Sequence, residues 1–188
     1  MDQDTEELSF THKFEHACTL LGSARAVLFM STPDHDDMDV HIQIHKTDAS
    51  GKVLQYINIP KEDRDAVGMT KVELVNPMVY LGPIGALRAS YRQIDQNLST
   101  ERWPEHNFSQ REMLERGQIV QLEIGLWQTG IRFEAGEQLV LKVSGHPMTL
   151  AEFPPLRGAM QNANKGRHSI HVGGEHISRL IIPTVPSS

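Results

Sequence analysis

Two alternating apolar runs in the second half of the chain constrain its fold more than any other feature. Residues 119–127 and 138–143 carry an apolar side chain at every second position, which is the period of a β-strand with one buried face. In the first run, Val120, Leu122 and Ile124 share one face. The two runs predict neighbouring β-strands, and with them an all-β sandwich.

Further strands are expected at residues 8–14, 24–30, 38–45, 52–57, 87–92 and 179–183. Residues 48–51 predict a hairpin turn, because they end in a glycine that can adopt positive φ. Residues 58–83 lack a clear period, and we expect a long excursion there with at most a short strand or helix. The 188 residues are predicted to form one β-sandwich domain with its core over about 8–183.

Charge and hydropathy argue against two classes of partner, nucleic acids and membranes. The formal charge is −6, with 18 basic residues scattered among 24 acidic ones, which does not suit a nucleic-acid surface. No apolar run approaches the roughly 20 residues that span a bilayer, so no membrane partner is expected. The acidic amino terminus is unlike a secretory signal, and the lone Cys18 suits a reducing compartment. We therefore expect a cytoplasmic protein.

The common catalytic and cofactor motifs are missing from the sequence. There is no Gly-x-Ser-x-Gly nucleophile elbow, and no glycine-rich loop with the spacing that cradles phosphates. No bound cofactor is predicted.

A cluster of histidine and aspartate between residues 35 and 45 is the first candidate site. Asp39, His41 and His45 are candidate catalytic side chains there. His41 and His45 share a strand face with Gln43 between them, a spacing and composition that do not favour zinc. The aspartates of residues 34–39 also lack the register of a calcium-binding EF-hand. No metal is predicted, and this face is expected to be solvated or to contact another domain.

The second candidate site lies between residues 168 and 176. His168 and His171 are candidate bases there, although neighbours on a strand point apart and need not converge. The alternative interpretation is a polar loop that orders the last strand through histidine hydrogen bonds. Trp127, outside the face of Leu126, is a candidate contact for a partner or a substrate.

The order of four segments carries a family resemblance. Residues 87–92, 117–124, 133–139 and 176–183 together resemble the carboxy-terminal domain of X-prolyl dipeptidyl peptidases and of cocaine esterase-like hydrolases. The likeness runs from about Leu8 to Pro183. One departure is Ile177, where the family usually has proline.

The resemblance implies a jelly-roll sandwich of the galactose-binding-like class. In the family this domain follows an α/β-hydrolase domain that carries the catalytic serine, aspartate and histidine, and this sequence contains no such domain. By position, Met38, Asp39 and Val40 would lie near the edge of the hydrolase active site and contact the substrate. The implied partner is that hydrolase domain, or a second copy of the chain forming a homodimer.

The leading hypothesis is therefore an accessory domain of a serine hydrolase that cleaves peptide or ester bonds, such as a dipeptidyl peptidase. One alternative is a stand-alone biosynthetic enzyme, an isomerase or cyclase, that binds a small molecule. Another is a carbohydrate-binding module, which rests on fold class alone. An accessory domain predicts an exposed apolar patch, whereas an enzyme predicts a pocket with converging His, Asp or Glu side chains.

Overall fold

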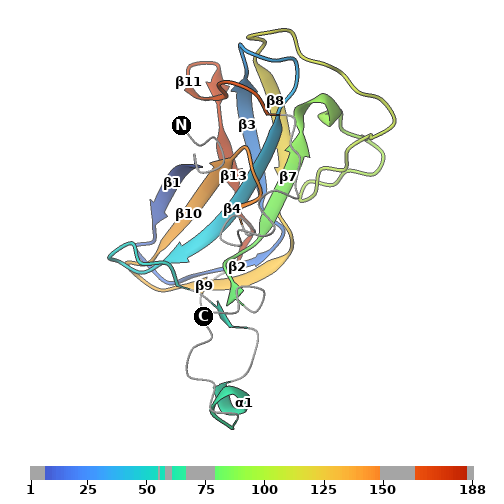
Figure 1. The fold of residues 1–188 in the computed structure, drawn as a ribbon. Helices are drawn as coiled ribbons and strands as arrows, with labels where there is room; N and C mark the ends of the chain where they lie inside the picture. Colours follow the sequence, from blue (N-terminus) through green and yellow to red (C-terminus); the bar gives the residue numbers. More distant parts are fainter. Residues whose placement is uncertain (1–6, 55, 58–60, 67–78, 149–163, 186–188) are drawn as a thin grey trace.

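The computed structural model describes residues 7–54, 56–57, 61–66, 79–148 and 164–185, and its fold is an all-β sandwich with curled sheets (Figure 1). One sheet is fully antiparallel and has the order β1-β10-β4-β7. Its strands are β1 (Glu7–Lys13), β10 (Gln138–Ser144), β4 (Asp39–Thr47) and β7 (Ile84–Arg88).

The second sheet is centred on β3 (Arg25–Ser31). On one side β3 pairs with β8 (Val120–Gly125), and on the other with β11 (Ser169–Gly173) and β13 (Arg179–Ile181) in turn. Between β11 and β13 the chain makes a hairpin through β12 (His176–Ile177). A third, smaller sheet has the order β14-β2-β9, formed by β14 (Thr184–Val185), β2 (Cys18–Gly22) and β9 (Thr129–Phe133).

The two apolar runs form strands, as predicted, but they are not neighbours in a sheet. The first run is β8, which pairs with β3, and the second is β10, which lies between β1 and β4. Residues 129–133 between them form β9, with Ile131 and Phe133 buried. This strand pairs with β2 and carries the chain from one main sheet to the other (Figure 1).

The core is filled by side chains from both main sheets. Leu122 and Ile124 of β8 belong to the same buried cluster as Ile42 and Ile44 of β4, and all four are almost fully buried. Burial of each such side chain stabilises the fold by about 1.5 to 3 kcal/mol. Near the curled end, the Phe133 ring stacks on Phe14 with centroids 4.6 Å apart. The period-two pattern of the sequence therefore identifies the core-facing positions correctly.

At one edge the two main sheets approach each other closely. The backbone N–H of Trp127 donates to the carbonyl of Ile84, at 3.1 Å. A Cβ atom on Gly85 would lie 2.3 Å from the carbonyl oxygen of Gly125, so only glycine fits where β7 meets the end of β8. This contact closes the sandwich on the side of β7.

Other strand predictions hold in part. The turn at residues 48–51 is confirmed, with Gly51 at φ 87° and an antiparallel bridge between Thr47 and Val53. The strand predicted at 52–57 is reduced to that bridge and to β5 (Tyr56–Ile57). The strand predicted at 87–92 ends at Arg88, because residues 89–91 turn as a short 3₁₀ helix.

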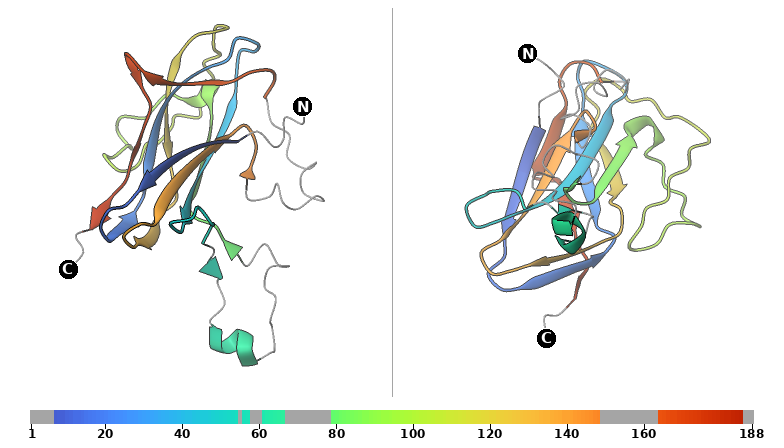
Figure 2. Two further views of the ribbon diagram at one scale, coloured as in Figure 1. Left: turned by 90° about the vertical axis from the view of Figure 1, so that its left-hand side faces the viewer. Right: turned by 60° about the horizontal axis from the view of Figure 1, so that its bottom comes forward.

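The excursion predicted at 58–83 contains α1 (Lys61–Ala66) and β6 (Val79–Tyr80), which pairs with β5. Figure 2 shows α1 well away from the sandwich. The rest of residues 58–78 lies outside the described residues. In the part of the chain that is described, no helix has the length and apolar character needed to cross a membrane.

Candidate functional site

The acidic loop between β3 and β4 and the first residues of β4 provide the candidate site, but its carboxylates do not converge. Asp34 accepts hydrogen bonds from the backbone and side chain of Arg167, and Asp36 pairs with His35 at 3.0 Å. Asp37 and Asp39 have further partners of their own. In the described residues, no three His, Cys, Asp or Glu side chains are grouped so that they could hold a metal ion.

Asp37 organises the loop from the inside. Its side chain is 1% exposed and accepts hydrogen bonds from the backbone N–H groups of Met38 and Ser90, both at 2.9 Å. The half-exposed guanidinium of Arg111 closes the arrangement at 2.8 Å. The N–H of Ala89 also donates to the carbonyl of Met38. These bonds draw residues 89–91 into the 3₁₀ turn and attach the long loop after it to the start of β4.

Asp39 connects three segments that are distant in sequence. Its carboxylate accepts two hydrogen bonds from the Arg88 guanidinium on β7, at 2.7 and 2.9 Å. Its backbone N–H donates to Oδ1 of Asn164, at 2.7 Å, and its carbonyl accepts from Nδ2 of the same residue, at 2.9 Å. The bidentate ion pair fixes the orientation of the Arg88 guanidinium. The Arg88 side chain remains about one-third exposed.

Two of the candidate histidines lie within the electrostatic influence of Asp39. Burial lowers the pKa of His41; the Asp39 carboxylate opposes this shift and nearby His146 adds to it. Burial also lowers the pKa of His168, against the opposing charges of Asp34 and Asp39. Both imidazoles are therefore neutral at neutral pH. Neutral imidazoles can accept or donate hydrogen bonds without adding charge near Asp39.

His45 and His171 do not join this group. His45 lies further along β4, where burial lowers its pKa to about 4, with Lys142 and Glu7 as the nearby charges. His171 lies on β11, where its Nε2 is 2.9 Å from the hydroxyl of Ser31. Ser178 links β3 to β11 in the same region. Its hydroxyl accepts a hydrogen bond from the N–H of Phe29 and donates one to the carbonyl of His171. Of the five candidate catalytic residues, the structure associates only Asp39, His41 and His168.

Comparison with known protein families decides the identity of the domain. Residues 1–181 match the family described as the X-Pro dipeptidyl-peptidase C-terminal non-catalytic domain. The chain belongs to this family. No curated protein sequence matches it significantly.

Solved structures agree with this membership. A CocE/NonD family hydrolase from Staphylococcus aureus is 28% identical with a TM-score of 0.78, over 98% of this chain and 31% of that chain. An aminopeptidase from a marine sediment archaeon, Thaumarchaeota archaeon, covers 97% of this chain and 26% of its own, at 16% identity and a TM-score of 0.59. An alpha-amino acid ester hydrolase has the same identity and TM-score, over 98% and 26%. The last two show the fold alone, and the non-catalytic domain spans less than a third of each hydrolase.

Two other predictions for this non-catalytic domain need correction. Met38 and Val40 are 0% and 1% exposed and belong to the core, so their side chains are not placed to contact a substrate. The face of β4 that bears Gln43 and His45 is not solvated, because these residues are 1% and 6% exposed. β4 is also a central strand that pairs with β10 on one edge and with β7 on the other. Trp127, in contrast, is 69% exposed, as its position outside the Leu126 face predicts.

Arg88, Arg111 and Asn164 are the site residues that sequence reasoning missed. Arg88 lies directly opposite Asp39 in the β4–β7 register, so the pair could have been found only if that strand pairing were known. Asn164 and Arg111 come from loops with no periodic signal. Their contacts with β4 and its loop span 125 and 74 residues of sequence.

Proposed function

We propose that this non-catalytic domain packs on an α/β-hydrolase domain and shapes the rim of its active site, without taking part in bond cleavage. The observation that carries the proposal is the family match over residues 1–181, combined with the 31% share of the Staphylococcus aureus hydrolase that the chain covers. The substrate class would be esters or peptide bonds, X-prolyl amides included. We further propose that the chain is one sandwich domain and acts in the cytoplasm, where its single, free Cys18 stays reduced.

The residues around Asp39 support a rim role. Asp39 would be a positioning residue, because its carboxylate holds the exposed Arg88 guanidinium in one orientation. A fixed guanidinium can donate hydrogen bonds to a carbonyl or carboxylate on the acyl side of a substrate. His41 and His168, which interact electrostatically with Asp39, are neutral and would contribute hydrogen bonds, not charge.

The stand-alone enzyme hypothesis receives less support. It predicts acid and base side chains that converge in a pocket. Among the described residues, Asp34, Asp36, Asp37 and Asp39 each pair with a different basic residue, and His45 and His171 lie apart from them. Asp34, Asp37 and Asp39 instead join the loop and the start of β4 to basic residues that are distant in sequence.

A chimaera tests the rim role. The Staphylococcus aureus hydrolase with this chain in place of its own C-terminal domain should hydrolyse esters. Substituting Arg88→Ala in it should raise KM about tenfold with little change in kcat, because a hydrogen bond from a charged group contributes about 1.5 kcal/mol. Initial-rate kinetics measure both constants, and the melting temperature reports folding.

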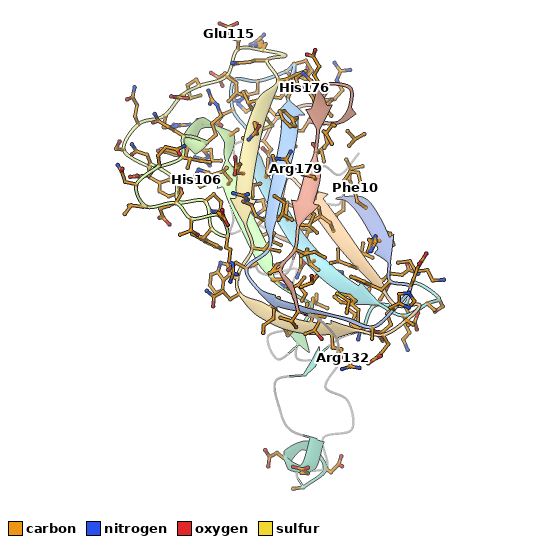
Figure 3. The ribbon with its side chains drawn as sticks, turned by 180° about the vertical axis from the view of Figure 1, so that it is seen from behind. Phe10, His106, Glu115, Arg132, His176 and Arg179 are labelled. Carbon is orange, nitrogen blue, oxygen red and sulfur yellow. The ribbon has the colours of Figure 1, made fainter. Side chains whose placement is uncertain are left out.

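Arg132→Ala is the matched control. Arg132 also forms an ion pair with a carboxylate, Glu134, at 2.7 Å, but it lies on β9 at the lower end of the sandwich (Figure 3), whereas β4 begins at the upper end (Figure 1). We expect its KM to equal that of the parent chimaera. Equal KM values for both variants in folded, active protein would contradict a role of Arg88 at the rim.

A further inference from the structure

Arg88 and Arg111 place two fixed guanidinium groups at one end of the sandwich. Arg88 ends β7 and lies opposite Asp39, the first residue of β4. Two residues nearer this end, the N–H of Ser90 donates to Asp37, which also binds Arg111. Since two residues of a strand span roughly 7 Å, the two ion pairs are neighbours. Figure 1 shows β7 running into its final turn at the end where β4 begins.

The electrostatics of Arg88 agree with this arrangement. Its hydrogen bonds with Asp39 raise its pKa most, burial opposes the shift, and the charges of Asp37 and Tyr91 add to it. The guanidinium of Arg111 contacts the same two groups, because it bonds to Asp37 at 2.8 Å and lies 5.8 Å from the centroid of the Tyr91 ring. Both guanidiniums are therefore grouped around Asp37 and Tyr91.

In both ion pairs the acid is buried and the base faces outward. The side chains of Asp37 and Asp39 are 1% and 13% exposed, whereas those of Arg111 and Arg88 are 45% and 35% exposed. A solute that approaches this end of the sandwich meets the positive side of both pairs. Although the formal charge of the chain is −6, distant exposed charges are screened by salt, so an anion here responds mainly to the two arginines.

Each guanidinium keeps donors for a further partner. Arg88 uses Nε and Nη2 for Asp39, and Arg111 uses Nε for Ser90 and Nη2 for Asp37. Within the described part of the chain, Nη1 of neither arginine has a hydrogen-bond partner. A guanidinium has five N–H donors, and the edge formed by Nη1 and Nη2 fits a carboxylate.

Arg92 differs from these two arginines. Its Nη1 donates to the carbonyls of Ala89 and Glu112, and its Nη2 pairs with the Glu112 carboxylate at 3.0 Å. The side chain is only 17% exposed, and its donors hold the loop after β7 in place. The outer edges of Arg88 and Arg111 serve no such structural contact.

We propose that Arg88 and Arg111 together bind a carboxylate, each donating from its outer edge. Binding itself needs only this chain. The use of the site rests on the proposed function, because at the rim of an active site it selects esters and amides whose acyl part carries a second, charged carboxylate. Asp37 and Asp39 are positioning residues that hold the two guanidiniums in place.

Titration of the isolated chain tests the site. Monomethyl glutarate carries a carboxylate, and dimethyl glutarate is its neutral counterpart. Heteronuclear NMR that includes the arginine Nε–H signals should show saturable binding of the first and none of the second. Arg88→Lys and Arg111→Lys keep the charge beside each aspartate but remove the planar fork, so each should weaken binding about tenfold.

Arg132→Lys is the matched control, because Arg132 forms an exposed ion pair with Glu134 on β9, and it should leave binding unchanged. Three outcomes overturn the site: no saturable binding of monomethyl glutarate, equal weakening by the control, or no weakening by Arg111→Lys in a chain whose spectrum remains folded. Tighter binding of inorganic phosphate than of monomethyl glutarate would overturn the assignment of the ligand as a carboxylate.

Kinetics of the chimaera test the use of the site. The substrates are the nitrophenyl monoester of glutaric acid, whose acyl part is charged, and nitrophenyl butyrate, whose acyl part is neutral. Arg111→Lys should raise the ratio of KM for the charged ester to KM for the neutral ester about tenfold, and Arg132→Lys should leave this ratio unchanged. An unchanged ratio for Arg111→Lys would contradict selection at the rim while the binding result stands, so the two claims fail separately.

Discussion

Replacing Asp37 by alanine should lower the free energy of unfolding by about 3 to 5 kcal/mol, since two buried N–H groups and an ion pair lose their acceptor. The N–H groups of Met38 and Ser90 both donate to Oδ1 of this carboxylate, which is 1% exposed. A buried N–H group that loses its acceptor is destabilising, and here two N–H groups lose the same one. Urea denaturation, followed by the fluorescence of Trp103 and Trp127, measures the loss.

Asp36→Ala is the control for this prediction. Asp36 precedes Asp37 but is about half exposed, and in the described residues it forms an ion pair with its sequence neighbour His35. An exposed pair of this kind contributes less than about 1 kcal/mol, so the control should stay close to the wild type. Equal losses for the two variants would show that the loop is not organised by Asp37.

Acidification from pH 7 to pH 4 should destabilise the chain, with His45 contributing roughly 2 to 3 kcal/mol at about 1.4 kcal/mol for each pH unit of pKa difference. Burial lowers the pKa of His45 in the folded chain to about 4, from an ordinary value of 6.5. Between these values the unfolded chain binds the proton and the folded chain does not. The contribution is therefore fully present above about pH 6.5 and is lost as the pH falls toward 4.

His45→Gln isolates this contribution from that of His41 and His168, whose lowered pKa values act in the same direction. The variant should have a shallower loss of stability between pH 6.5 and 4 than the wild type, whatever its stability at pH 7. Urea midpoints measured across this range give the two curves. Parallel curves would show that His45 can be protonated in the folded chain.

The sequence predicts single strands better than their arrangement. Val40, Ile42 and Ile44 alternate so regularly that both the strand and its buried face could be identified. The pairing of the strands was harder to predict, because β8 and β10 have the same alternating pattern. They belong to different sheets since the chain forms β9 between them. Thr129 and Gly130 at the start of β9 conceal its strand character, because glycine is a weak strand residue.

The same limit applies to the site. Asp39, His41 and His168 stood out as titratable side chains, but their environment depends on residues far away in the chain. Gln43 and His45 looked like part of a solvated polar stripe, because alternation shows which face a side chain takes and not what covers it. The resemblance to the hydrolase family identified the domain, while the roles of Arg88, Arg111 and Asn164 became visible only through their contacts.

The central claim is that this sandwich does not cleave bonds and serves a separate catalytic domain. The most direct test is to assay the purified chain with ester and X-prolyl amide substrates, with and without a serine-directed inhibitor. We expect no turnover that the inhibitor removes, and no serine labelled covalently. Inhibitor-sensitive turnover, with the label on a serine of this chain, would contradict the account.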